Sequence, residues 1–183
     1  IDWRDWSSDV CSSDLIEASD AITIDYKQTE VSLSGIELIE SYTKSEQVSV
    51  LNKNGLEIIP YPLGFYPKHQ EKLGFYLEVY NTLNILGQNE RFLIKSYIES
   101  FETGQIINGF AKQQLFNVAE VVPFLYEFPI KELPSGNYHL VIDVINKENQ
   151  VIAHNYIFFQ RSNPEFEDRK STRLNSSHVS QTR

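Results

Sequence analysis

The sequence predicts an all-β fold with little helix. Val, Ile, Phe and Tyr recur in short runs that alternate with polar residues, which is the period of a strand with one buried face. Turn residues separate these runs at short intervals, and apolar residues never keep the helical spacing i, i+3, i+4, i+7 for more than two turns. We therefore expect an antiparallel β-sandwich of immunoglobulin-like architecture.

The first part of the chain has a less regular pattern. Residues 36–39 (IELI) favour either a strand or a short helical turn. Residues 48–51 and 56–59 are predicted to form a strand pair around Asn54-Gly55, because both residues of that turn tolerate positive φ.

The middle and the end have clearer signals. Residues 73–83 alternate strongly, and with 91–100 they predict a hairpin closed by a turn at 84–88. Residues 105–113 are read as a strand of mixed pattern. The segment 122–130 predicts an edge strand, since it contains two prolines that cannot donate to a ladder.

The last third is the best organised. Turn residues at 133–137 open onto a strand at 138–145, and the polar loop 146–149 closes a hairpin onto 150–160.

The two ends of the chain are related as DNA rather than as protein. One codon choice for DRKSTRLNSS at residues 168–177, reverse-complemented and read in another frame, encodes WSSDVCSSD at Trp6–Asp14. Both strings look like translated sequencing-library adapter. Such scars are set aside before fold reasoning, so we expect an interior fragment of a longer protein.

The expected domain organisation follows from this exclusion. Residues 1–15 are expected to be adapter-derived, and 16–33 to be a tail or last strand of a preceding domain, with Ile22, Ile24 and Tyr26 alternating. Residues 34–164 are expected to form the sandwich, and 165–183 a disordered linker start with an adapter-derived tail.

Composition excludes several classes of function. The net charge is −9, and the absence of a basic run argues against nucleic acid as a partner. No apolar stretch approaches the roughly 20 residues of a membrane span. Cys11, the one cysteine, lies in the excluded segment, which leaves no thiol chemistry and no Cys-ligated zinc. No cofactor is expected.

Two histidines and a carboxylate form a weak candidate metal site. A four-residue loop between the last two strands would place His154 opposite Val141, with His139 and Asp143 as diagonal neighbours on the same face. These are metal-ligating residue types. The alternative, which we favour, is that they form the polar side of a hairpin and hold no metal.

Five aromatic residues form a weak candidate ligand-binding surface: Tyr61, Phe65, Tyr66, Tyr76 and Tyr80. Aromatic side chains are favoured at recognition surfaces, so a sugar-binding or protein-binding face is one interpretation. The interpretation we favour is packing, in which Phe65 and Tyr66 hold an irregular loop over the sandwich and the other tyrosines cover a sheet face.

Signals for catalysis are absent from the sequence. There is no G-x-S-x-G elbow, no Walker loop and no H-E-x-x-H. The carboxylate pairs Glu37/Glu40 and Glu99/Glu102 have no evident partner that would create an acid/base couple, and we expect them to be solvated. The sequence therefore predicts no enzyme activity.

Several spaced strings resemble the β-rich middle region of the GWxTD-domain proteins, which are exported and of uncharacterised function. They are SGIELIES (Ser34–Ser41), KNGLEIIPYP (Lys53–Pro62), FYLEVYN (Phe75–Asn81), LPSGNYHLVIDV (Leu133–Val144) and FFQRSNP (Phe158–Pro164). The Gly-Trp-x-Thr-Asp motif itself does not occur here, so the resemblance transfers no functional residue. It implies an exported or cell-envelope setting.

The sequence thus favours a non-catalytic β-sandwich module that acts as a spacer or protein-interaction domain in a larger protein. One alternative is a carbohydrate-binding module that uses the surface aromatics. A second is a fragment of an enzyme whose catalytic domain lies elsewhere.

Overall fold

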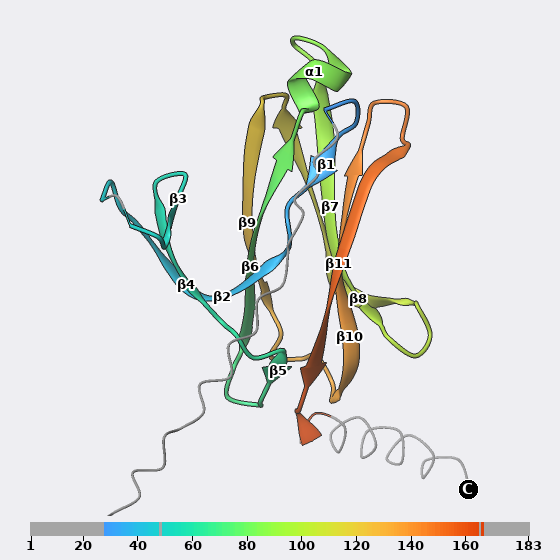
Figure 1. The fold of residues 1–183 in the computed structure, drawn as a ribbon. Coiled ribbons are helices and arrows are strands. Elements are labelled where there is room, and N and C mark those ends of the chain that lie inside the picture. Colours follow the sequence, from blue (N-terminus) through green and yellow to red (C-terminus); the bar gives the residue numbers. More distant parts are fainter. Residues whose placement is uncertain (1–27, 48, 165, 167–183) are drawn as a thin grey trace, which may run out of the picture.

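The computed structural model describes residues 28–47, 49–164 and 166, which form two β-sheets packed face to face (Figure 1). The first sheet contains β1 (Ser32–Leu33), β2 (Glu37–Lys44), β3 (Asn52–Lys53), β4 (Leu56–Pro60), β6 (Lys72–Tyr80) and β9 (Val121–Pro129). The second contains β5 (Phe65–Tyr66), β7 (Arg91–Ser100), β8 (Ile106–Asn117), β10 (Gly136–Ile145) and β11 (Val151–Arg161). The predicted all-β sandwich is confirmed.

The hairpin predicted between 73–83 and 91–100 is wrong. β6 pairs with β1, β2 and β9, whereas β7 pairs with β8 and β10 in the opposite sheet. The helix α1 (Thr82–Leu86), where a turn was predicted, carries the chain from one sheet to the other (Figure 1). Thr82 fixes its start, because the buried Oγ1 donates to the carbonyl of Ala119 (2.8 Å) and accepts from its amide (3.0 Å).

The core lies between the two sheets, and strand alternation decides which side chains enter it. On β6 the inward residues are Leu73, Phe75, Leu77 and Val79, as the alternating pattern predicts, and all four have no exposed surface. They pack against the inward residues of β7, β10 and β11, which include Ile94, Ile98, Leu140, Ile142, Val144 and Phe159.

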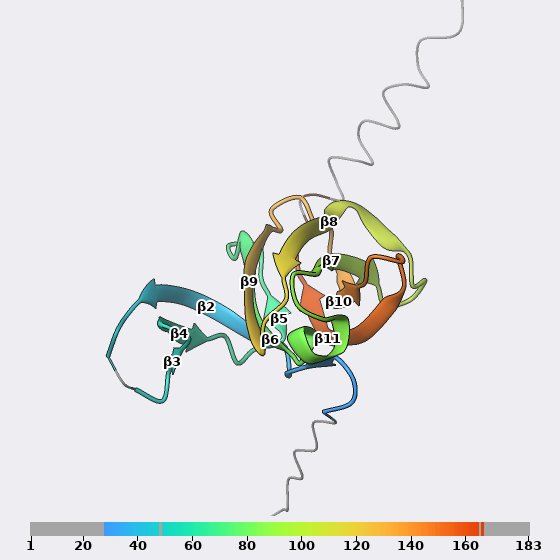
Figure 2. The same cartoon turned by 90° about the horizontal axis from the view of Figure 1, so that it is seen from above.

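Three strands form an arm that leaves the sandwich. β2 pairs with β6 only from Glu37 to Ile39, and its later residues pair with β4 instead. We call β3, β4 and residues 41–44 of β2 the arm, which projects to one side in Figures 1 and 2. Its β3–β4 turn uses Asn54 (φ 51°) and Gly55 (φ 79°), as the sequence predicts.

A second, smaller apolar cluster fixes the base of the arm. Ile39 and Ile58 pack on Tyr76, which lies on the outer face of β6 and is only 2% exposed. Because the core covers one face of β6 and this cluster covers the other, every residue from Leu73 to Leu77 is buried.

The remaining strands follow the sequence closely. β10 and β11 form the predicted hairpin, and β9 pairs only with β6 among the described strands, as expected of an edge. β8 is longer than the predicted 105–113. In the described part of the chain, no helix is long and apolar enough to cross a membrane.

The N-terminal boundary of the sandwich lies earlier than predicted. Val31 is 5% exposed within the core, and β1 pairs with the end of β6. Residues 31–33 therefore contribute to the sandwich, because the end of β6 that β2 does not cover needs a partner. The alternating segment 22–26 lies outside the described residues.

Arg161 closes the end of the sandwich at which β5 lies. Its guanidinium is buried, and Nη1 donates to the carbonyl oxygens of Pro67 (2.7 Å) and Gln70 (2.6 Å). Burial lowers the pKa of this guanidinium. The contacts attach the loop after β5 to the end of β11.

Candidate functional site

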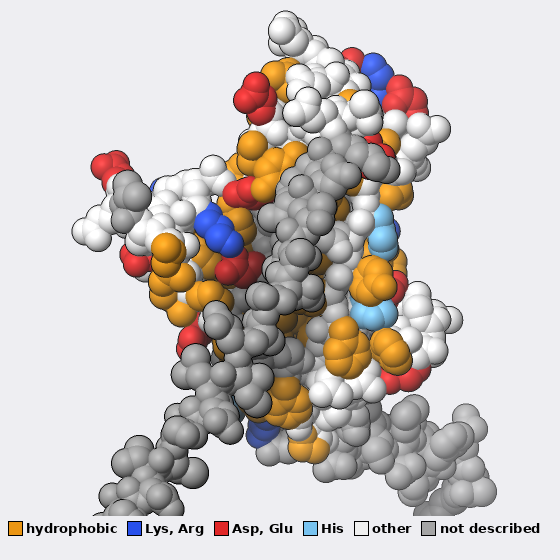
Figure 3. All heavy atoms as spheres, in the orientation of Figure 1, with side chains coloured by type: hydrophobic (Ala, Val, Ile, Leu, Met, Phe, Trp, Pro, Cys, Tyr) orange, Lys and Arg blue, Asp and Glu red, His pale blue; other side chains and the backbone are white. Residues whose placement is uncertain are grey.

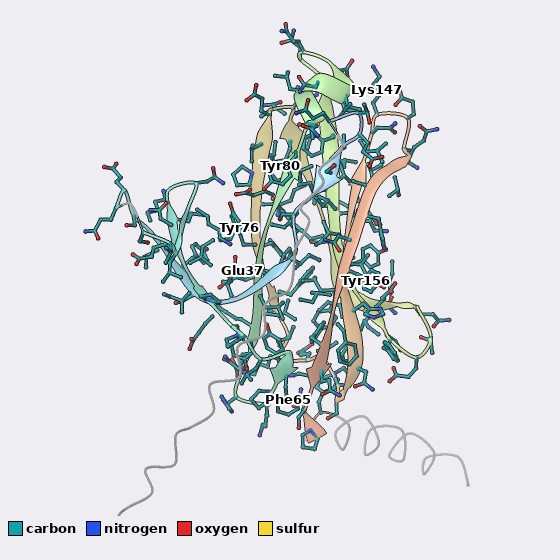
Figure 4. All side chains as sticks on the ribbon, viewed as in Figure 1. Glu37, Phe65, Tyr76, Tyr80, Lys147 and Tyr156 are labelled. Carbon is teal, nitrogen blue, oxygen red and sulfur yellow. The ribbon has the colours of Figure 1, made fainter. Side chains whose placement is uncertain are left out.

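The outer face of the β10–β11 hairpin exposes large aromatic side chains. On β11 the residues Ile157 and Phe159 point into the sandwich, so Tyr156 and Phe158 point outward. Tyr156 is 56% exposed and Phe158 is 42% exposed. Figure 4 shows Tyr156 projecting from β11 away from the core.

Rings from three segments meet on this face. Phe101, in the turn after β7, lies 5.4 Å from Phe158 and 5.3 Å from His139 between ring centroids. Tyr156 lies 4.8 Å from His139 and 6.0 Å from His154. We call these five residues the aromatic strip. Figure 3 shows histidine side chains next to hydrophobic ones on this side of the molecule.

The strip has a packed floor. Val141 of β10 lies between Tyr97 of β7 and Tyr156 of β11 in the strand register. Although it is on the outer face, Val141 is only 1% exposed. The side chains around it therefore form a continuous layer, which holds the exposed rings in place.

The strand register predicted for two of the metal-site candidates, Asp143 and His154, is wrong. His154 lies opposite Asp143 rather than Val141. Ile145 pairs with Val151 instead of Gln150, and a bulge between Val144 and Ile145 shifts the ladder by one further position. The direct pairing brings Nδ1 of His154 to 2.7 Å from Oδ1 of Asp143. Asp143 is nearly buried, whereas half of the His154 side chain is exposed.

The third metal-site candidate does not join this pair. His139 lies opposite Phe158 and contacts Glu99, with 3.4 Å between Nδ1 and Oε1. Among residues 28–47, 49–164 and 166, no three His, Cys, Asp or Glu side chains are grouped so that they could hold a metal ion. The geometry is that of two separate histidine–carboxylate pairs.

Among the described residues, no serine, threonine or cysteine is a register neighbour of the Asp143–His154 pair on its face of the sheet. Burial, followed by interaction with Asp143, raises the pKa of Tyr97 to about 12, so the phenol stays protonated and donates to the carboxylate. The register neighbours of the pair are Lys95, Tyr97 and Tyr156. None is the aliphatic hydroxyl or thiol that a histidine base would activate.

Polar side chains connect at one end of the strip. Asn137 donates from Nδ2 to Oε1 of Glu102 (2.9 Å), and its Oδ1 accepts from Nε2 of Gln160 (2.9 Å). These contacts join β10, β11 and the turn after β7. Amide and carboxylate groups held in this way are fixed donors and acceptors beside the rings.

A second polar group lies in a cleft between the arm and the sandwich. Lys53 of the arm forms an ion pair with Glu37, and its Nζ lies 5.7 Å from the ring centroid of Tyr76. Asn54 donates from Nδ2 to Glu78 Oε1 (2.7 Å) and to the Tyr76 hydroxyl (2.8 Å). The cleft has a volume of about 580 Å³, and Figure 4 labels Glu37 and Tyr76 beside it.

Glu78 is the centre of this group. The hydroxyls of Tyr76 (2.7 Å) and Tyr80 both donate to its carboxylate. Partial burial raises the pKa of Glu78, but the hydrogen bonds from Tyr80, Tyr76 and Asn54 outweigh burial and hold the pKa below its ordinary value. Its oxygens are used in attaching the arm, so the group is a structural latch rather than an acid/base pair.

The five aromatic residues predicted as a ligand surface do not come together. Tyr66 is 1% exposed and packs on Tyr61 and Phe159, and burial raises its pKa. Phe65 is exposed beside it (Figure 4). Tyr76 and Tyr80 lie in the cleft instead.

Sequence reasoning missed most of the strip. It did not single out Phe101, Tyr156 or Phe158. Aromatics in a strand, such as Tyr156 and Phe158, are usually assigned to the core, and Phe101 lies in a turn outside any strand. A usable signal was present in 156–159, where both faces of one strand carry large apolar residues. One of those faces has to lie outside the core.

No protein-family model and no curated protein matches the chain. Among solved structures, the chain is similar to a glycosyl hydrolase family 2 member from Bacteroides cellulosilyticus, with 13% identity over 71% of this chain and a TM-score of 0.40. It is also similar to a β-glucosidase from Kluyveromyces marxianus in complex with glucose, with 10% identity over 73% of this chain and a TM-score of 0.31. The chain spans 14% of the length of each of these proteins. At such values their activities do not carry over to it.

Proposed function

We propose that this chain is a non-catalytic β-sandwich module that recognises another molecule through the aromatic strip. The observation that supports recognition over a spacer role is the exposure of Phe101, Tyr156 and Phe158 on a single face. Exposed aromatic residues that gather on a packed floor are typical of binding surfaces.

Panning a displayed library of random peptides against the chain tests this proposal. Peptides converge on recognition surfaces, where rigid aromatic anchors supply most of the binding energy. The enriched peptides should compete with one another and lose binding to Tyr156→Ser and Phe158→Ser. The matched control is Tyr42→Ser, which removes a tyrosine that is 40% exposed on the arm. Peptides that bind these variants equally well would argue for a spacer.

The proposed setting is a longer, exported protein of the GWxTD-domain type. The spaced strings from Ser34 to Pro164 support it. The test is the uninterrupted open reading frame in clean genomic DNA. A Gly-Trp-x-Thr-Asp motif downstream and an export signal upstream are expected, and genomic continuity of residues 1–15 with the sandwich would contradict the adapter assignment.

A further inference from the structure

We propose that the aromatic strip binds an extended, uncharged polysaccharide that lies along β11, an inference that rests on the recognition role proposed above. The outward residues of β11 are His154, Tyr156, Phe158 and Gln160. With a rise of about 3.3 Å per residue, they form a track roughly 20 Å long. That is the length of several sugar units.

The centre of the track offers apolar ring surface. Sugar rings carry C–H groups on their faces, and these pack on exposed aromatic rings, while the sugar hydroxyls need polar partners around them. Tyr156 and Phe158 are two residues apart on one strand, and Phe101 adds a third ring beside Phe158. The layer over Val141 holds this surface in place, which reduces the entropy lost on binding.

Both ends of the track offer fixed hydrogen-bonding groups. The Asn137–Glu102–Gln160 network lies at one end and the Asp143–His154 pair at the other. Planar amides, carboxylates and imidazoles present several donors and acceptors to neighbouring hydroxyls. Ring surface flanked by such polar groups suits a polyhydroxylated chain. A protein partner would instead be expected to meet a more apolar surface at the centre of its interface.

Charge limits which polysaccharide is accepted. Glu99, Glu102 and Asp143 lie along the strip, and the whole chain has a net charge of −9. One lysine, Lys95, lies on the adjoining strand over the Tyr97 ring. An acidic polysaccharide would be repelled by these carboxylates, so we assign an uncharged glycan.

Calorimetric titration of the full chain with two oligosaccharides of equal length tests this inference. A cello-oligosaccharide is the uncharged probe and an oligogalacturonate is the anionic probe. The uncharged probe should bind, and the anionic probe should bind at least about tenfold more weakly. An absence of binding to the uncharged probe, or a preference for the anionic one, would overturn the assignment.

Substitutions in the aromatic strip and on the arm test where on the molecule the oligosaccharide binds. Phe158→Ala and Phe101→Ala should each weaken binding of the cello-oligosaccharide by about tenfold, equivalent to roughly 1.4 kcal/mol. Tyr156→Phe keeps the ring and should retain affinity within about threefold, whereas Tyr42→Ala on the arm should change nothing. Each variant is first checked for wild-type thermal unfolding, and Phe101 lies in an exposed turn where truncation is best tolerated.

Negative results in the peptide experiment and in the oligosaccharide experiment contradict different proposals. Peptides that converge on the strip without any oligosaccharide binding would overturn the polysaccharide assignment and keep the recognition role. Oligosaccharide binding that is unchanged in both Phe158→Ala and Phe101→Ala would place the site elsewhere on the molecule and overturn the assignment.

Discussion

Asn54, at the tip of the β3–β4 turn, donates a hydrogen bond of 2.7 Å to Glu78 on β6. The two residues are 24 positions apart in the sequence, and their contact connects the arm to the sandwich. The apolar contacts of Ile39 and Ile58 with Tyr76 fix the base of the arm. The Asn54–Glu78 contact fixes its tip, and the first two predictions concern this latch.

Glu78→Gln should lower the free energy of unfolding by about 1 kcal/mol, because two tyrosine hydroxyls and one amide lose a charged acceptor at a partly exposed site. Urea denaturation measures the change. Glu40→Gln, which replaces an exposed carboxylate on β2, is the matched control and should unfold at the wild-type urea concentration. Equal effects of the two substitutions would remove Glu78 from the latch.

The stabilisation from Glu78 should depend on pH in a defined direction. Its pKa in the folded state lies below the ordinary value of 4.5. A lowered pKa contributes stability that is fully present above about pH 5 and is lost as the pH falls through the folded-state pKa. The difference in unfolding free energy between wild type and Glu78→Gln should therefore be constant at neutral pH and shrink below about pH 4.5. A difference that grows on acidification would contradict the lowered pKa.

Arg161→Lys should lower the free energy of unfolding by about 2 kcal/mol, because an ammonium cannot reproduce the planar donors that reach the carbonyls of Pro67 and Gln70. Thermal unfolding measures the loss. The control is Arg91→Lys, at an exposed position on β7, which should leave the melting temperature unchanged. An unchanged melting temperature in Arg161→Lys would show that the loop after β5 keeps its position without the guanidinium contacts.

Gly74→Ala should destabilise the chain by about 1–3 kcal/mol. A Cβ at this position would lie 2.9 Å from Cγ1 and 3.1 Å from the carbonyl oxygen of Ile39. Ile39 is where β2 leaves β6 for the arm, so the clash would disturb both the β2–β6 pairing and the start of the arm. Gly35→Ala, with nothing within 4 Å of the added Cβ, is the matched control in denaturant unfolding, and a similar loss there would show that the contact with Ile39 is not the cause.

The sequence predicts the strands better than their partners. The hairpin of β10 and β11 could be predicted because a short polar loop joins two strongly alternating runs. β6 and β7 alternate just as clearly, yet they lie in different sheets. Alternation reports which face of a strand is buried, and it does not report the neighbour that buries it.

The site was only partly predictable for the same reason. His154 and Asp143 were both singled out. A loop one residue longer than predicted and a bulge between Val144 and Ile145 together changed their relation from diagonal to direct. Tyr66 and Tyr76 were singled out as aromatics, and both are buried. To predict that Tyr156 is exposed, one would have to know which face of β11 is turned away from the core.

The burial of β6 on both faces has a consequence for how the chain tolerates substitution. β7 is covered on one face, with buried and partly exposed positions in turn along Phe92–Ile98. In a saturation mutagenesis survey, polar replacements along β7 would survive at every second position. From Leu73 to Leu77, by contrast, no position would accept them, so this short stretch would change little as the rest of the sequence diverges.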